Sequence, residues 1–215
     1  MIKLYKGKKP DILEKNSDRW TKEYLKYKNL GIGNENIKTK YNHPEIKSAL
    51  LNETHEKCAY CESKFLHVSP GDIEHIIPKS KRPELYVKWE NLTISCEQCN
   101  RSGKKNYYDI DLPLINPYLD NPEEHFYECG SLIFPKLNDN RAEITINVIK
   151  LNRASLVERR KERIESVDKL LRSWAKEERE YMKEELHRQL IEECREDKEY
   201  SSTIKAFLIA SKFPM

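Results

Sequence analysis

Two short stretches decide how this chain folds: CAYC at residues 58–61 and CEQC at residues 96–99. In each stretch two residues separate the cysteines, so both thiolates of one turn can bind the same metal ion. Two such turns supply four sulfur ligands, the tetrahedral set that zinc prefers, and leave no open position for catalysis. The sequence therefore predicts a structural zinc ion (Zn²⁺) bound by Cys58, Cys61, Cys96 and Cys99.

The composition of the 215 residues limits the class of protein. With 35% charged and 38% hydrophobic residues, the supply of core side chains is thin, and a net charge of +3 does not by itself indicate a nucleic-acid partner. No apolar run is long enough to span a bilayer, so we expect a cytoplasmic protein with no membrane partner. Thiols stay reduced in the cytoplasm, which favours zinc over disulfides for the paired cysteines.

The segments before the first cysteine pair indicate helices. Ile12, Trp20 and Tyr24 recur at helical intervals within residues 11–30, which end at a glycine. A second helix is predicted over 44–57, opened by a His-Pro step. We expect residues 1–50 to form an N-terminal helical arm, and residues 51–106 to form the motif-rich centre.

The segments after the second pair divide into two further regions. Residues 107–152 are expected to form a Pro-rich crossing and a β-hairpin that turns at Gly130, while 143–151 (EITINVIKL) indicate a strand, or a strand entering a helix. Residues 153–215 are expected to be helical.

An apolar stripe extends from Leu156 to Cys194 without Pro or Gly. It predicts either one long helix or two helices with a break near residues 176–180, followed by a short closing helix. The stripe needs a partner surface, which is either the chain's own core or another subunit.

Between the cysteine pairs, three ionisable side chains interrupt an apolar strand in DIEHIIP, residues 72–78: Asp72, Glu74 and His75. Asn91 follows in an ENL segment, and Asn100 comes directly after the second cysteine pair. This order, spread over residues 58–106, resembles the HNH endonuclease family. The resemblance implies a ββα-metal unit, in which two short strands and a helix surround one divalent ion, and an enzyme that hydrolyses phosphodiester bonds. The fold class is then α+β and mostly helical, with this unit and its zinc site at the centre, between the arm and the C-terminal helices.

The resemblance also implies catalytic roles, for His75, Glu74, Asn91 and Asn100. His75 is the predicted general base, because an imidazole titrates near neutral pH. Glu74 and Asn100 are predicted to bind the catalytic ion with help from Asp72, and their oxygen ligands suit Mg²⁺ or Mn²⁺. Glu74 would point away from His75 in an ideal strand, and Asn91 would brace the loop that carries His75. The family usually has Asp at position 74, so a catalytically degenerate zinc-dependent binding module is an alternative.

Positive charge is concentrated beside this motif, with seven basic and three acidic residues between Lys79 and Lys105. The candidates for contact with nucleic-acid phosphates are Lys79, Arg101, Lys104 and Lys105. We expect DNA as the substrate. RNA stays open, because a catalytic unit of this size contacts mainly the backbone.

A wider resemblance extends over the flanks, in MIKLYKGKKP at the start, TINVIKLNR at residues 145–153 and LVERR at 156–160. These segments are similar to the HNH proteins of Septu-type anti-phage defence systems, including those attached to retrons. In such systems the nuclease works with a separate ABC-like ATPase subunit of the PtuA type. The resemblance implies this partner, docked on the arm or on the C-terminal helices. The alternative is a stand-alone HNH nuclease of restriction or mobile-element type.

Overall fold

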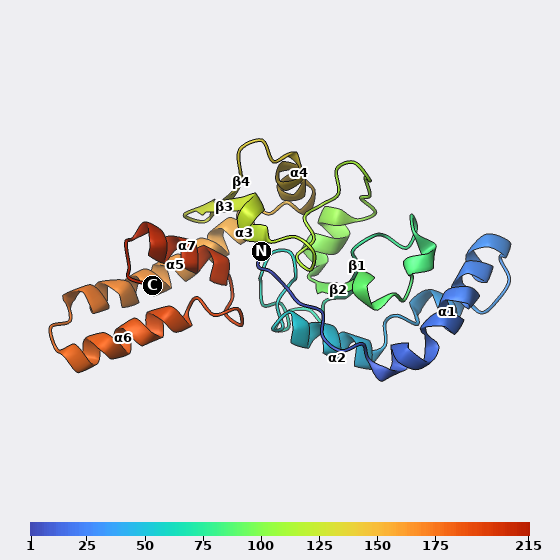
Figure 1. Cartoon of the computed structure of the whole chain (residues 1–215), viewed down its shortest axis with the longest axis horizontal. Coiled ribbons are helices and arrows are strands. Elements are labelled where there is room, and N and C mark those ends of the chain that lie inside the picture. The colour runs from blue at the N-terminus through green and yellow to red at the C-terminus, as the bar shows by residue number, and fades with distance from the viewer.

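Apolar side chains gather in two separate cores along the chain, which the computed structural model describes over residues 1–215. The larger core holds 28 buried residues and includes both cysteine pairs. The smaller core comes from the C-terminal helices and consists of Val167, Leu190, Ile204, Leu208 and Phe213. The molecule is therefore elongated, with the first helix at one end and the C-terminal helices at the other (Figure 1).

Helix α1 (Asp11–Leu30) has the bounds that the sequence predicted. Its buried residues are Leu13, Trp20 and Tyr24, which lie on the face turned toward the larger core. Gly31 ends the helix in the left-handed conformation, with φ of 67°, which glycine adopts without a steric penalty. Helix α1 forms the end of the molecule that lies farthest from the C-terminal helices, and we call it the arm (Figure 1).

The chain returns from the arm through a 3₁₀ turn, η1 (Glu35–Thr39), to helix α2 (Pro44–Glu53). The ring of His43 caps this helix by accepting a hydrogen bond from the backbone N–H of Glu45 at 3.2 Å. Helix α2 ends four residues before the predicted boundary at residue 57. It packs on the central sheet and so joins the arm to the centre.

The centre consists of two short strands and a helix. Strand β1 (Asp72–His75) pairs antiparallel with β2 (Leu92–Ser95), and the connection between them contains the 3₁₀ turns η2 (Pro83–Leu85) and η3 (Trp89–Asn91). A wide helix of π type, η4 (Gln98–Lys104), follows β2. The order strand, strand, helix is the one that the HNH resemblance implied.

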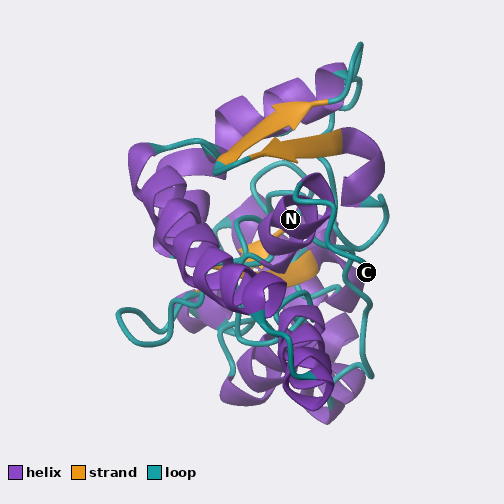
Figure 2. Ribbon diagram, turned by 90° about the vertical axis from the view of Figure 1, so that its left-hand side faces the viewer, coloured by secondary structure: helices purple, strands orange, loops and turns teal.

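A second sheet lies beside the centre (Figure 2). A short helix, α3 (Pro122–His125), leads into the predicted hairpin of β3 (Phe126–Cys129) and β4 (Leu132–Pro135), which turns at Gly130. Helix α4 (Asn140–Ile149) comes next. The expectation of a strand at 143–151 was therefore wrong.

The reason for helix α4 lies in its spacing and its cap. The Asp139 carboxylate accepts a hydrogen bond from the backbone N–H of Ala142 at 2.8 Å, which caps the first turn. The β-branched residues had suggested a strand, but burial recurs every three or four residues, as a helix requires. The buried residues are Ala142, Thr145, Ile146 and Ile149.

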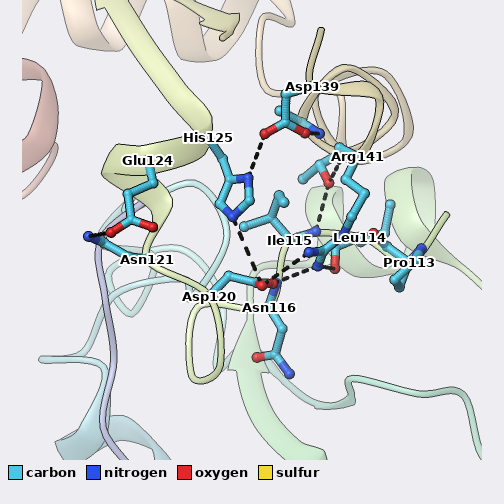
Figure 3. Close-up of polar contacts among 12 residues, drawn as sticks. Pro113, Leu114, Ile115, Asn116, Asp120, Asn121, Glu124, His125, Asp139 and Arg141 are labelled. Atoms are coloured by element: carbon cyan, nitrogen blue, oxygen red, sulfur yellow. Dashed lines mark hydrogen bonds and ion pairs between the residues drawn. The ribbon is translucent and has the colours of Figure 1, made fainter.

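Figure 3 shows how the crossing before the hairpin is fastened to α4. The Arg141 guanidinium donates to the Asp120 carboxylate at 2.7 Å and to the carbonyl oxygen of Pro113 at 3.0 Å. His125 donates from Nδ1 to Asp139 at 2.6 Å. The irregular segment is thus held by side chains rather than by a sheet.

The C-terminal region contains α5 (Ala154–Lys176), α6 (Glu180–Glu192) and α7 (Ser201–Ala210). The break falls within residues 176–180, so of the two predictions the pair of helices is confirmed. Helices α6 and α7 pack against α5 and cover much of its apolar stripe, so the chain itself supplies the partner surface (Figure 1). None of the helices combines the length and the apolar composition needed to cross a membrane.

Candidate active site and zinc centre

The four paired cysteines converge in the larger core. All four are buried, and their sulfur atoms lie within 4.8 Å of one another. The Sγ atoms of Cys61 and Cys96 are 3.8 Å apart. Four sulfurs at about 2.3 Å from a tetrahedral zinc ion would be separated by about this distance. The geometry and the chemistry of these ligands therefore fit a structural zinc ion.

Arg153 lies against this cluster, and sequence reasoning did not identify it. Its guanidinium nitrogens are 3.5 Å from the sulfur of Cys99 and 3.9 Å from those of Cys61 and Cys96. Burial acts to lower the pKa of Arg153, but the neighbouring sulfurs outweigh it and raise the pKa. Four thiolates and one Zn²⁺ carry two net negative charges, so the half-buried guanidinium of Arg153 compensates part of this charge.

A signal for Arg153 was present in the segment TINVIKLNR. Leu151 is completely buried, and the side chain of Asn152 both accepts from the N–H of Ile133 at 2.9 Å and donates to its carbonyl at 2.7 Å. Three consecutive residues thus join α4, the hairpin and the cysteine cluster. The last three residues of TINVIKLNR thus have a structural role, which is to hold these parts of the molecule together.

His75 ends β1 and is only 6% exposed, among aromatic rings. Its Nε2 lies 2.8 Å from the carbonyl oxygen of Tyr86. Because a carbonyl can only accept a hydrogen bond, Nε2 carries the proton, and the lone pair is on Nδ1. Tyr41 contacts the imidazole edge-on, with ring centroids 4.7 Å apart. Burial lowers the pKa of His75 to about 4, although the hydrogen bond to Tyr86 opposes this, so the ring is neutral at pH 7.

Asn91 fastens the chain that follows His75. Its Oδ1 accepts from the N–H of Ile77 at 2.8 Å, and its Nδ2 donates to the carbonyl of Ile77 at 3.0 Å. Its own carbonyl accepts from the N–H of Ile76 at 2.9 Å. Three hydrogen bonds therefore fix the backbone directly after the imidazole.

Glu74 forms a buried ion pair with Lys104. The Lys104 ammonium donates to the Glu74 carboxylate and to the carbonyl of His75, the latter at 2.8 Å. Burial raises the pKa of Glu74, and Lys104 acts in the opposite direction. Lys104 was expected at the surface as a phosphate contact, but it is only 3% exposed. The turn of the wide helix η4 directs it inward, where it compensates a carboxylate.

Asp72 and Asn100 lie together at the open end of the same sheet. The amide of Asn100 donates to Asp72 at 3.1 Å, and Arg101 donates two hydrogen bonds to the same carboxylate, at 2.9 Å and 2.7 Å. Asp72 and Glu74 share one face of β1, since they are two residues apart in a strand. Asp72, Glu74 and Asn100 are oxygen donors of the kind that bind hard divalent cations, but the Glu74 carboxylate is buried and already paired with Lys104.

The remaining predicted phosphate contacts differ in exposure. Arg101 is exposed and paired with Asp72, and Lys105 is exposed directly after the end of η4. Lys79 is half-buried on the other side of the site, with its ammonium 4.1 Å from the centre of the Tyr41 ring. The structure thus brings His75, Asn91, Glu74, Asp72 and Asn100 to one small sheet and its two connections.

Comparison with known proteins connects this geometry to a family. Residues 58–106 match the family model described as HNH endonuclease. The chain is 34% identical over 154 residues to the Septu protein PtuB of Bacillus thuringiensis. This alignment covers 71% of this chain and 55% of that protein. It is 30% identical over 199 residues to PtuB of Bacillus mycoides (strain KBAB4), covering 74% of this chain and 66% of that protein.

A third relative carries a different name. The chain is 28% identical over 138 residues to the Septu protein PtuA of Bacillus mycoides (strain KBAB4), which covers 49% of this chain and 19% of that protein. The chain spans between about half and two thirds of the length of the two PtuB proteins. Residues 58–106 are therefore similar to the HNH endonuclease family, in agreement with the resemblance seen in the sequence, and most of the chain is similar to Septu PtuB proteins.

Proposed function

We propose that this chain is a metal-dependent endonuclease that hydrolyses nucleic-acid phosphodiester bonds as the effector of an anti-phage defence system. The observation that carries the proposal is the environment of His75, a neutral imidazole whose Nε2–H is fixed by a backbone carbonyl. Its free Nδ1 can accept a proton, and oxygen ligands for a cation lie on the same short strand. The HNH family match at residues 58–106 supports the same chemistry.

In this proposal His75 is the general base. Its Nδ1 takes a proton from the attacking water, and the imidazolium that forms keeps its hydrogen bond to the Tyr86 carbonyl, which stabilises the positive charge. Asn91 holds the following backbone, so the ring keeps its orientation during the transfer. His75 is the catalytic residue and Asn91 is a positioning residue.

Glu74, Asp72 and Asn100 would hold the divalent cation, for which we propose Mg²⁺ or Mn²⁺. A cation bound there supplies neutralising charge to the phosphate and to the leaving oxygen. Burial raises the pKa of Glu74, and the ion pair with Lys104 acts against this rise by favouring the ionised carboxylate. The exposed Arg101 and Lys105 lie where a substrate phosphate can reach them.

We further propose an ABC-like ATPase of the PtuA type as partner and DNA as substrate. Support for the partner comes from the Septu names of all three relatives. Support for DNA comes only from the nuclease family, and RNA is the second substrate to be tested.

The test is cleavage of plasmid DNA and of a structured RNA in Mg²⁺ or Mn²⁺, with and without the purified ATPase. Wild type should cut, whereas His75→Ala should lose activity by about 100-fold or more while keeping its zinc and its circular dichroism spectrum. Equal cutting by both proteins would overturn the role of His75. Full activity without any ATPase would favour the stand-alone nuclease.

A second function is favoured by one observation, the cation already placed at Glu74. If Lys104 permanently replaces the metal, the domain binds nucleic acid without cutting it. Retention of a labelled DNA by wild type, together with no cleavage under any metal or partner condition, would support this binding module over the enzyme.

A further inference from the structure

A basic groove lies between the arm and the candidate active site. It has a volume of about 390 Å³ and is enclosed by the last turns of α1, by η1 and by the loop that follows β1. These three segments come from different parts of the chain and are joined by the hydrogen bonds of Lys28 to Ser80 and of Lys79 to Lys38. The lining residues are Tyr24, Tyr27, Lys28, Gly31, Lys38 and Lys79.

Two of the three lysines in the groove have no carboxylate partner. The Lys28 ammonium donates to the backbone carbonyl of Ser80 at 2.9 Å, and the Lys79 ammonium donates to that of Lys38 at 3.0 Å. Neither forms a salt bridge, whereas Lys38 is paired with Glu35. The groove therefore holds two ammonium groups that are fixed in place by neutral carbonyls and form no salt bridge.

The groove is linked to the surroundings of His75 by contacts between side chains. Tyr41 contacts both Lys79 and His75. The Lys79 ammonium is 4.1 Å from the centre of the Tyr41 ring, and the centroids of the Tyr41 and His75 rings are 4.7 Å apart. Tyr24, in the groove, stacks on Tyr86 at 4.0 Å, and the carbonyl of Tyr86 holds His75. A strand whose phosphate is attacked at His75 would thus have a neighbouring phosphate near Lys79.

The aromatic rings in the groove are already covered. Tyr24 is stacked on Tyr86, and the Lys38 ammonium lies over Tyr27 at 4.9 Å from its centroid. Because Tyr24 is buried and the Lys38 ammonium lies over Tyr27, the two unpaired lysines are the main contacts that the groove offers, and the ligand that fits them is an anionic backbone. Burial lowers the pKa of Lys79 to about 8, and an anion at its ammonium would favour the charged form.

We propose that Lys28 and Lys79 bind a phosphate of the substrate strand next to the one that is cleaved, so that the arm is part of the nucleic-acid surface. This inference rests on the proposed nuclease function, and it assigns α1 a substrate contact in place of ATPase docking. Because only backbone is contacted, binding through the groove is independent of base sequence.

The test compares Lys28→Gln/Lys79→Gln with a matched control, Lys15→Gln/Lys169→Gln. The control removes the same two charges from exposed lysines outside the groove, and these too have no salt bridge. Affinity is measured by fluorescence anisotropy at several salt concentrations, in buffer without added Mg²⁺ or Mn²⁺, with short duplex DNAs and RNAs of different sequence. The groove variant should bind about tenfold more weakly, equally for every sequence, and the magnitude of its slope of log K against log[salt] should fall by about 1, as expected for the loss of one phosphate contact.

A Lys28→Arg/Lys79→Arg variant keeps the charge and should restore both affinity and slope, which separates lost contacts from lost folding. If the Gln variant matches the control in affinity and slope, or if wild type binds neither nucleic acid, the groove is not a phosphate site. Cleavage assays on the same proteins distinguish the two proposals. If the wild-type protein cleaves nucleic acid and the groove variant binds it with normal affinity, only the proposed phosphate site is overturned. If the wild-type protein binds nucleic acid through the groove but does not cleave it, only the proposed nuclease function is overturned.

Discussion

The sulfur cluster and the oxygen cluster lie on the same small unit, yet their charges are balanced differently. The four cysteines are accompanied by one guanidinium, that of Arg153. The two carboxylates of β1 are each paired with a cation of the protein, Glu74 with Lys104 and Asp72 with Arg101. The sulfur cluster therefore lacks positive charge, whereas the charges of the oxygen cluster are balanced.

This difference predicts how each cluster depends on metal. Four buried thiolates with one cation are unfavourable unless a divalent ion is present, so the zinc ion is part of the folded state. The oxygen cluster is stable without a metal, because its carboxylates already have partners. We therefore expect zinc to control folding and the catalytic ion to be exchangeable.

The largest effect is expected from the sulfur cluster. Cys58→Ser should release zinc and unfold the centre of the molecule, because the free energy of structural zinc binding is about 10 kcal/mol or more, comparable to the whole stability of a domain. Thermal unfolding followed by circular dichroism, with zinc content measured on the same samples, tests this.

The matched change in the oxygen cluster is Asp72→Asn. It removes one carboxylate whose partner, Arg101, is 64% exposed, so stability should change by less than about 1 kcal/mol and zinc should be retained. A Cys58→Ser protein with the wild-type melting temperature would contradict the comparison, as would loss of zinc from Asp72→Asn.

The next effect concerns the buried pair of Glu74 and Lys104. Lys104→Met leaves a carboxylate buried without its partner and should cost about 3–5 kcal/mol, and Glu74→Gln should cost a similar amount by isolating the ammonium. The variant with both substitutions should lose less stability than the sum of the two single losses. Urea unfolding of all four proteins in a double-mutant cycle measures this difference. Mn²⁺ should raise the melting temperature of Lys104→Met and leave Cys58→Ser unfolded. Additive losses would mean that the pair is not coupled.

The titration of His75 is expected to have a somewhat smaller effect. Its pKa is about 4 in the folded protein and about 6.5 in the unfolded chain, so the unfolded chain binds the additional proton between these values. The contribution of His75 to the free energy of unfolding is therefore fully present above pH 6.5, and about 3 kcal/mol of it is lost as the pH drops to 4. His75→Gln cannot titrate and should lack this part of the pH dependence in urea unfolding. Parallel curves for both proteins would show that the imidazole is not buried in its neutral form.

The features predicted from sequence are those that depend on short-range patterns. The cysteine spacing predicted the sulfur cluster, and the apolar spacing with Gly31 predicted the bounds of α1. In α4, β-branched residues indicated a strand, but packing of one helical face decided the structure. Local propensity gave the wrong element there because the deciding contacts are tertiary.

The candidate site shows the same limit. The run of Lys104 and Lys105 indicated two surface charges, yet one is buried against a carboxylate 30 positions away in the chain, and the other is exposed. Arg153 lies 54 positions from Cys99, and no spacing rule connects them. The residue types of a site can be predicted from its motif, whereas the partners that balance its charge depend on the fold. The catalytic roles of His75 and Glu74 stay predictions until the cleavage assays are done.

The smallest effect is expected from Arg153, which tests whether the charge of the sulfur cluster is partly compensated by the protein. Arg153→Met keeps the length of the side chain but removes its charge, so zinc affinity should fall by about tenfold, which corresponds to about 1.4 kcal/mol. Arg153→Lys keeps the charge without the forked donors and should lose less. Competition with a chromogenic chelator measures the affinity of both. Unchanged affinity in Arg153→Met would mean that zinc alone balances the four thiolates, and that the guanidinium only fills space between α4 and α5.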